Sequence, residues 1–140
     1  MGQLVRDIMT KDPISVSGKT PLADCAKKMK EANVGALLVT KDGGHICGVV
    51  TDRDITIRGV AEEQDPKRTP VEKICSGDVT TVSPDDEADK VIELMRKKAI
   101  RRVPVVKGDR PVGIVSIGDL AMQRDQRSAL ADISAAAPNR

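Results

Sequence analysis

Apolar and polar positions along the chain follow one succession of periodicities, and the chain runs through it twice. In the first copy, the largely β-branched residues 14–16 predict a short strand, and apolar residues recurring at intervals of three and four over 22–32 predict a helix. Apolar runs at 36–39 and 46–50 flank a glycine-containing turn and predict a hairpin. A second helix is expected to begin at Asp52. The predicted unit is therefore strand, helix, strand, strand, helix.

The second copy repeats this pattern. Val5 aligns with Val71 at a spacing of 66 residues, and Asp54 aligns with Asp119 at a spacing of 65 after one deletion. Two copies are too few for a stacked solenoid, which needs more neighbours to bury its core. The elements expected in the second copy are a strand at 79–82, a helix over 88–95, a hairpin of 103–106 with 112–115, and a helix from 117, and a short turn of helix is expected to open each copy at 5–9 and 71–75.

Proline and polar residues that flank the predicted elements indicate where they begin and end. Thr20-Pro21 and Ser83-Pro84 fit an N-cap followed by proline at the first helical position, so the first helix of each copy is expected to begin there. A unit of about 55 residues buries too little of its surface to be stable alone, so the two copies are expected to pack face to face as one α/β domain. The expected organisation is a repeat at 4–60, a linker at 61–70, a repeat at 71–126, and a flexible or helical tail at 127–140.

Composition narrows the classes of function. The chain has 140 residues and no Phe, Tyr or Trp, so its core must be aliphatic, and it lacks the aromatic platform on which nucleic-acid bases usually stack. Its 23 basic and 21 acidic residues give a formal charge of +2, too even for a general attraction to polyanions. No apolar run suits a signal peptide or a membrane span, and a soluble cytoplasmic protein without a membrane or nucleic-acid partner is expected.

The sharpest chemical signal is a seven-residue segment that occurs in both copies, at residues 48–54 and 113–119. Each has a hydroxyl residue at the end of a buried strand and an aspartate three residues later, Thr51 with Asp54 and Ser116 with Asp119. Free N–H groups at a helix start suit a phosphate, and an ionised aspartate suits the two hydroxyls of a ribose. The alternative interpretation is a capping box that stabilises the helix start and binds nothing.

The cysteines, the histidine, the methionines and the cationic run give weaker evidence of function than these two segments. Three cysteines without a C-x-x-C pair, at positions 25, 47 and 75, are expected to be reduced and mostly buried. His45 is expected to be an exposed loop residue, because no metal-ligand spacing surrounds it. Met29 and Met95 are expected in the core, and the cationic run at 96–98 is interpreted as a solvated helix face. No metal site is expected.

The repeat order, the two Gly-x-x-Thr/Ser-x-x-Asp segments, the run 101–106 and the run 82–86 together resemble a tandem pair of cystathionine-β-synthase (CBS) domains, or Bateman module. The first copy from Thr51 through Gly59 is similar to that of small bacterial CBS-pair proteins such as the hypoxic response proteins. The resemblance implies two repeats related by a pseudo-twofold axis, packed sheet to sheet, with two clefts between them. It also implies adenosyl ligands such as AMP, ADP, ATP or S-adenosylmethionine, no required cofactor, and a homodimer that associates through its helices.

Carried over residue by residue, the resemblance gives two sets of nucleotide-binding residues. Each set takes the Gly-x-x-Thr/Ser-x-x-Asp end of one repeat and the first two strands of the other. The first set is Thr51, Arg53, Asp54, Val79, Thr80, Ile100, Arg101 and Arg102, and the second, weaker set is Pro13, Ile14, Val34, Gly35, Ala36, Ile114, Ser116, Gly118 and Asp119.

The two sets differ in charge. The first contains three arginines, whereas the second has Gly35-Ala36 where the first has Arg101-Arg102. Arginines make charge-assisted bidentate bonds to phosphate, so the first set is expected to take a phosphorylated nucleotide. The second suits an uncharged adenosyl group or nothing. The alternative interpretation of Arg101-Arg102 is two solvated charges at a strand end.

Three functions follow, of unequal support. The first is a regulatory module that binds an adenosyl ligand between its repeats and signals to a separate, unknown effector protein. The second is an interaction module that dimerises and docks to another protein with vestigial, empty clefts. The third, an enzyme, lacks a nucleophile and base at catalytic spacing, and no catalytic residue is expected.

Overall fold

The computed structural model of the chain describes residues 2–75, 77 and 79–124. The predicted tail at 127–140 lies outside the described residues. The described chain divides into two compact units. Unit 1 joins residues 2–13 to residues 80–124, and unit 2 contains the described residues from Ile14 to Val79. Each unit is described by itself below.

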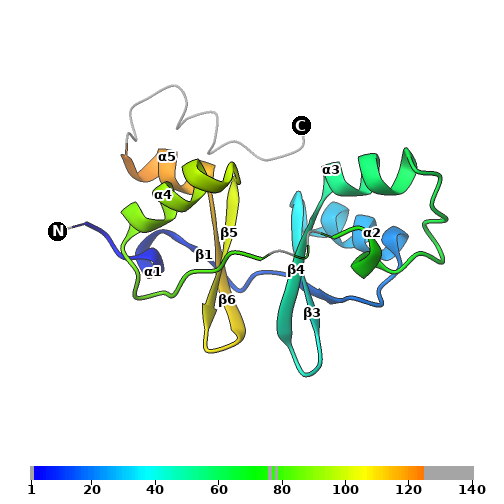
Figure 1. Cartoon of the computed structure of the whole chain (residues 1–140), viewed down its shortest axis with the longest axis horizontal. Helices are drawn as coiled ribbons and strands as arrows, with labels where there is room; N and C mark the ends of the chain where they lie inside the picture. The colour runs from blue at the N-terminus through cyan, green and yellow to red at the C-terminus, as the bar shows by residue number, and fades with distance from the viewer. Residues whose placement is uncertain (1, 76, 78, 125–140) are drawn as a thin grey trace. The chain divides into compact units, whose positions relative to one another are not determined.

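Unit 1 is a three-stranded sheet with helices on one side. Its strand order is β1-β6-β5, and Figure 1 shows α1, α4 and α5 on the same side of this sheet. The β5–β6 hairpin is antiparallel and pairs Arg102 with Ser116, and β1 adds to it antiparallel to β6. The bounds are α1 Val5–Ile8, β1 Thr10–Lys11, α4 Ala88–Lys98, β5 Arg102–Lys107, β6 Arg110–Ser116 and α5 Ile117–Arg124.

Unit 2 is likewise a three-stranded sheet, but its third strand lies at the opposite edge of the hairpin from that of unit 1. Its strand order is β2-β3-β4, with β2 parallel to β3 and β3 antiparallel to β4, and α2 and α3 lie on one side (Figure 1). The predicted α/β fold class is confirmed, as are both hairpins. The bounds are β2 Ser15–Ser17, α2 Leu22–Ala32, β3 Ala36–Lys41, β4 His45–Thr51, α3 Asp52–Asp54, a π-helix η1 Ile55–Val60 that continues α3, and a 3-10 helix η2 Val71–Lys73.

The short helices that open the two copies pack with the opposite copy. Val5 and Ile8 of α1 lie in the core of unit 1, which is otherwise built from the second copy. Val71 of η2 and Ile74 lie in the core of unit 2, which is otherwise built from the first copy. Both valines are fully buried. Each core is therefore completed by apolar side chains from the leading segment of the other repeat.

The helix starts differ from the prediction for a related reason. α2 begins at Leu22, and Thr20 does not cap it; the N–H groups of Leu22 and Ala23 donate to the carbonyls of Thr69 and Pro66 instead, at 3.1 and 2.8 Å. Orphan donors at a helix start need some acceptor, and main-chain carbonyls of the linker supply it.

The prediction for the first helix of the second copy is wrong by about one turn. α4 begins at Ala88, not after Ser83, and the N–H of Ala88 donates to the Gln3 carbonyl at 2.8 Å. Ser83 lies in a turn, and its N–H donates to Asp86 Oδ2 at 2.8 Å. This hydrogen bond lowers the pKa of Asp86. The Ser83-Pro84 pair therefore forms a turn and not a helix start. α4 can begin later because the Gln3 carbonyl, distant in sequence, accepts from the N–H of its first residue.

The predicted strand at 79–82 is also wrong, since only a single parallel bridge, Val82 with Val105, is present. In the first copy the N–H of Leu38 donates to the Ile14 carbonyl at 2.9 Å. The residue at the equivalent position of the second copy is Pro104, which has no N–H, so the bond to Thr80 cannot form. Loss of that donor shortens the strand to one bridge.

The other local predictions agree with the structure only in part, because Cys47 and Cys75 are partly exposed where the sequence predicts burial. Cys25, Met29 and Met95 are buried in the two cores. His45 is exposed as predicted, but it begins β4 and is not a loop residue. None of the described helices has the length and apolar character that a bilayer span requires.

The exchange of leading segments predicts where a core mutation acts. Val5→Ala removes two buried methyl groups and should lower the free energy of unfolding by about 2 kcal/mol. Hydrogen exchange should show loss of protection in β5 and β6 of unit 1, although Val5 belongs to the first repeat and these strands belong to the second. The matched control, Val71→Ala, should affect β3 and β4 of unit 2. Equal loss in both sheets from Val5→Ala would contradict this prediction.

Candidate functional site

The end of β4 in unit 2 carries one of the two predicted ligand-binding ends. Thr51 is the N-cap of α3: its Oγ1 accepts from the Asp54 N–H at 3.1 Å, and its own N–H donates to Asp54 Oδ2 at 2.9 Å. This reciprocal pair is a capping box. It fixes the Asp54 carboxylate at the junction of strand and helix.

The end of β6 in unit 1 repeats this geometry. The N–H of Ser116 donates to Asp119 Oδ2 at 2.8 Å, and Ser116 Oγ accepts from the Asp119 N–H at 3.2 Å. Ser116 Oγ also lies 3.0 Å from Asp119 Oδ2, to which its hydroxyl can donate. The capping interpretation is thus realised in both copies.

Capping does not use the whole carboxylate. In both copies the cap engages Oδ2, and within the described chain Oδ1 of Asp54 and of Asp119 has no hydrogen bond. Both residues are half-buried. An ionised carboxylate offers about four lone-pair sites, so each aspartate retains an acceptor for a ligand hydroxyl. Capping and ribose binding are therefore compatible at these positions.

The two helix starts differ in free N–H donors, and the expectation of free donors is wrong for Thr51–Asp54. The N–H of Asp52 donates to the Gly35 carbonyl at 3.0 Å, and the N–H of Arg53 donates to Asp52 Oδ1 at 2.9 Å. With Asp54 capped by Thr51, no donor of this first turn is left for a phosphate.

At the start of α5 one donor is left. The N–H of Ile117 donates to the Arg101 carbonyl at 3.0 Å, and Asp119 is capped by Ser116. The N–H of Gly118 has no acceptor among the described residues. The difference arises because Ile117 has no side-chain acceptor, whereas Asp52 has one.

The strand starts beside these ends carry the predicted contrast in charge. In unit 1, β-sheet register sets Arg102 opposite Ser116, next to Arg101. In unit 2, the same register sets Ala36 opposite Thr51, next to Gly35. Arg101 is exposed, Arg102 is half-buried, and within the described chain neither has an ion pair. Within unit 1, two cations thus flank the Ser116–Asp119 end.

The remaining predicted residues are distributed over both units. Ile100 packs against the core of unit 1, and Ile14 and Val34 pack against the core of unit 2. Each predicted set draws on unit 1 and unit 2, so both sets remain predictions. The other members are Pro13, Thr80, Ile114 and Gly118 in unit 1 and Val79 in unit 2.

The three cysteines all lie in unit 2. Burial raises the pKa of Cys25 to about 11, with Asp24 adding to the effect, and burial also raises the pKa of Cys47 and of Cys75. Thiols with raised pKa values are poor nucleophiles at neutral pH. Over the described residues, no three His, Cys, Asp or Glu side chains gather as a metal site.

The raised pKa of Cys25 predicts an alkaline loss of stability. A thiol whose folded pKa exceeds its unfolded value stabilises the fold fully below pH 9, and this contribution is lost as pH rises toward 11. Urea unfolding from pH 8 to pH 11 should show a fall in stability that exceeds the fall in Cys25→Ala by up to about 2 kcal/mol. Parallel pH profiles of the two proteins would contradict the burial of this thiol in its neutral form.

Comparison with known proteins gives the class of this chain. Residues 5–59 and residues 71–124 each match the family description of the CBS domain. The chain therefore belongs to the CBS domain family and is a tandem CBS pair, as the sequence predicted.

Its relatives include both uncharacterised and ligand-bound proteins. It is 38% identical over 135 residues to uncharacterized protein YlbB of Bacillus subtilis, covering 93% of this chain and 90% of YlbB. It is 33% identical over 116 residues to Hypoxic response protein 1 of Mycobacterium tuberculosis, covering 83% and 81%. Among solved structures, the CBS domain pair of protein MJ0100 in complex with 5′-methylthioadenosine and S-adenosyl-L-methionine matches with a TM-score of 0.82 at 30% identity, over 91% of this chain and all of that one.

Proposed function

We propose that this CBS pair is a regulatory module that binds an adenosyl ligand and signals to a separate protein. The observation that carries the proposal is the free Oδ1 of Asp54 and of Asp119, held at equivalent strand-to-helix junctions. The ligands of the MJ0100 pair, which share the adenosyl group, support it. Ligand binding shifts a conformational balance only by its differential affinity for two states.

The proposed binding residues are the two sets that the resemblance to CBS pairs implies. AMP, ADP, ATP and S-adenosylmethionine are the candidate ligands. We assign the ribose hydroxyls to the two aspartates and the phosphates to Arg101 and Arg102. The proposal includes a cytoplasmic homodimer, and it assigns no reaction to the protein.

Two positions compete for the phosphates. The sequence pairs Arg101 and Arg102 with Asp54 of the other repeat. The free N–H of Gly118 and the β5–β6 register instead favour a phosphate near Ser116 and Asp119. The coupling between an arginine and each aspartate distinguishes these positions.

Thermal unfolding with each candidate ligand tests the proposal. At about a hundred times the dissociation constant, a ligand adds about 2.7 kcal/mol to the stability of the protein. We expect at least one of AMP, ADP, ATP and S-adenosylmethionine to raise the midpoint of unfolding, and NAD serves as a larger dinucleotide comparison. No shift with any ligand would favour the alternative, an interaction module with empty clefts.

Paired variants then locate the phosphate. Asp54→Ala and Asp119→Ala each remove a cap and should lower the ligand-free stability by about 1 kcal/mol, independently of ligand. Each is combined with Arg102→Ala in a double-mutant cycle on ligand affinity. If the sequence-based pairing is right, Arg102 couples to Asp54 by about 1 kcal/mol and not to Asp119. Coupling to Asp119 alone would move the phosphate to the other set.

A further inference from the structure

The three cysteines gather around the core of unit 2, and the duplication shows that the fold does not need thiols there. Cys25 belongs to that core, and Cys47 and Cys75 pack against it. The residues at the equivalent positions of the second copy pack in or against the core of unit 1 without a thiol, and they are Val91, Val112 and Met9. Packing alone therefore does not explain why unit 2 has three cysteines.

A β-bulge directs Cys47 toward this core. In the β3–β4 hairpin, the pairs on either side of the bulge are Val39 with Gly48 and Thr40 with Ile46. Cys47 lies between them without a partner on β3, so it is the extra residue of β4. An extra residue of this kind changes the direction of its side chain. The Cys47 side chain accordingly packs against the core while it stays partly exposed.

Cys75 follows η2, which hydrogen bonds connect to the same end of the sheet. The N–H of Glu72 in η2 donates to the Gly18 carbonyl at 2.9 Å. The N–H of Gly18 in turn donates to the carbonyl of Thr40, on β3 beside the bulge, at 3.0 Å. These bonds hold η2, and with it Cys75, near the part of the hairpin that carries Cys47.

The second copy gives the geometry of the equivalent pair in unit 1. Met9, the equivalent of Cys75, lies so close to β6 that its Sδ is 2.5 Å from the position that a Cβ on Gly113 would take. Val112, the equivalent of Cys47, directly precedes Gly113. The corresponding arrangement in unit 2 sets Cys75 beside Cys47.

The electrostatics of the thiols agree with this placement. Burial raises the pKa of Cys75, and the Cys47 thiolate raises this pKa more than the carboxylates of Asp54 and Glu72 do. Such a charge effect decreases with distance, which indicates that Cys47 is the nearest of these groups. Cys75 affects the pKa of Cys25 less than two charged neighbours on α2 do, and Cys25 is fully buried. Cys47 is therefore the better partner for Cys75.

We propose that Cys47 and Cys75 are a redox-sensitive thiol pair, which forms a reversible disulfide that ties η2 to β4. The oxidant is a low-molecular-weight disulfide such as oxidised glutathione. The Cys47 thiolate attacks one sulfur of the oxidant, and the first glutathione leaves as a thiolate that takes up a proton. The Cys75 thiolate then attacks the Cys47 sulfur, and the second glutathione leaves in the same way. The two protein thiols lose two electrons and two protons, and the oxidant becomes two thiols.

The raised pKa values of this thiol pair slow the exchange, but they do not set its equilibrium. The rate depends on the fraction of thiolate, whereas the reduction potential decides whether the pair is oxidised. The Lys41 ammonium opposes the effect of burial on the pKa of Cys47, which makes this partly exposed thiol the first to attack. A pair that exchanges slowly would respond to sustained oxidation and not to a brief pulse.

A hydrogen bond connects the thiol pair to Asp54. Arg58 Nη1 donates to the carbonyl of Ile74, the residue before Cys75, at 3.2 Å, and Arg58 belongs to η1, which continues α3 from Asp54. The disulfide would draw Cys75 away from the Glu72 carbonyl, to which its Sγ donates at 3.8 Å, and would move the Ile74 carbonyl away from Arg58. Oxidation should therefore weaken adenosyl binding at Asp54, which is the part of this inference that rests on the proposed function.

Disulfide mapping on the full chain tests the thiol pair. The protein is equilibrated with reduced and oxidised glutathione at several ratios, and the remaining thiols are blocked in urea. Trypsin places residues 25, 47 and 75 in the separate peptides 20–27, 42–53 and 74–90, so mass spectrometry identifies each pairing. We expect peptides 42–53 and 74–90 to be linked within one chain, dithiothreitol to separate them, and Cys25 to stay reduced.

Variants with the residues of the second copy provide matched controls. Cys47→Val and Cys75→Met should each abolish the linked peptides, whereas Cys25→Val, designed in the same way, should leave them unchanged. Urea unfolding checks that the three variants remain folded, and the mapping of the unaltered chain does not depend on them.

Calorimetric titration of the reduced and the oxidised protein with AMP, ADP, ATP and S-adenosylmethionine tests the connection to Asp54. We expect oxidation to lower the affinity at least about fivefold. Arg58→Ala should weaken binding to the reduced protein and remove most of the further effect of oxidation, because it removes the hydrogen bond to Ile74.

Several outcomes would overturn the thiol pair. These are thiols that stay reduced at the highest proportion of oxidised glutathione, a lasting mixed disulfide of glutathione with Cys47 or Cys75, a linked peptide that contains Cys25, and a disulfide between two chains. A disulfide between Cys47 and Cys75 that leaves adenosyl affinity unchanged would refute only the connection to Asp54. If neither form binds an adenosyl ligand, the proposed function is refuted, while linked peptides would still support the thiol pair.

Discussion

The exchange of leading segments between the repeats is the constraint on which the rest of the structure depends. Val5 and Ile8 complete the core of unit 1, while Val71 and Ile74 complete that of unit 2. Residues shortly before these segments, Gln3 in one case and Pro66 and Thr69 in the other, supply carbonyls to the first N–H groups of α4 and α2. A repeat on its own would thus lack both apolar contacts and helix caps, so neither repeat is a complete folding unit. The chain must pass between units to build either one.

Each strand-to-helix junction stabilises a helix start and also leaves one carboxylate oxygen without a hydrogen bond among the described residues. At each, a hydroxyl residue and an aspartate three positions later satisfy one another's main-chain donors. This locks the carboxylate, so the oxygen that the cap leaves free has a fixed direction. A ligand that meets such a group loses little affinity to ordering it. In the proposed function, the cap therefore fixes the geometry of binding and does not compete with it.

Sequence patterns predicted the features that depend on neighbours in the chain. Both hairpins, both capping motifs and the buried faces of α2 and α4 follow from periods of two and of 3.6 residues, as at Cys25, Met29 and Met95. The starts of α2 and α4 were not predictable in this way, because Thr69 and Gln3, distant in sequence, supply their acceptors. The spacing of hydroxyl residue and aspartate predicted the two capping boxes. Which main-chain N–H groups stay free beside them depends on further hydrogen bonds, which the spacing does not reveal.

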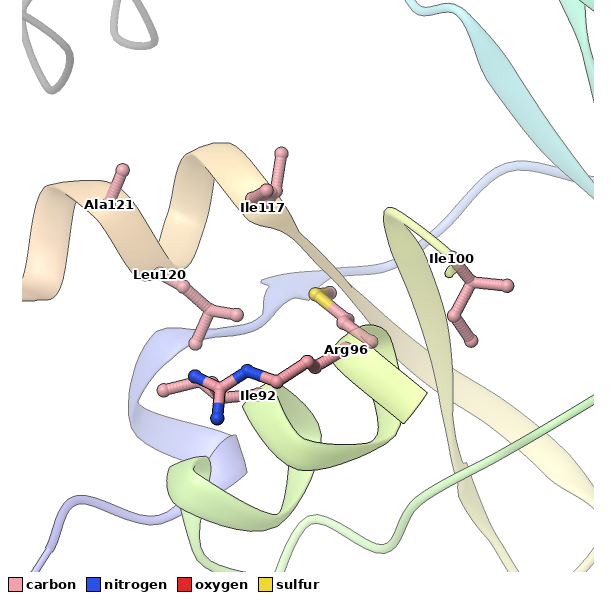
Figure 2. Close-up of a pocket in the computed structure, with 7 residues that line it drawn as sticks. Ile92, Arg96, Ile100, Ile117, Leu120 and Ala121 are labelled. Carbon is pink, nitrogen blue, oxygen red and sulfur yellow. The ribbon is translucent and has the colours of Figure 1, made fainter. Parts of the chain in front are cut away.

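Divergence at one pair of equivalent positions accounts for several differences between the repeats. Asp52 and Ile117 both occupy the first position of a helix after a cap. Asp52 accepts from the Arg53 N–H, so the first turn of α3 has no free donor; Ile117 cannot, so the N–H of Gly118 stays free. The same isoleucine lines an apolar groove together with Ile92 of α4 and Leu120 of α5 (Figure 2). Isoleucine at this position therefore leaves a main-chain N–H free to bind an anion and adds apolar surface beside it. Both features lie in the repeat that carries Arg101 and Arg102. A difference at this single position therefore changes the chemistry that the two helix starts offer, while both starts keep the same capping box.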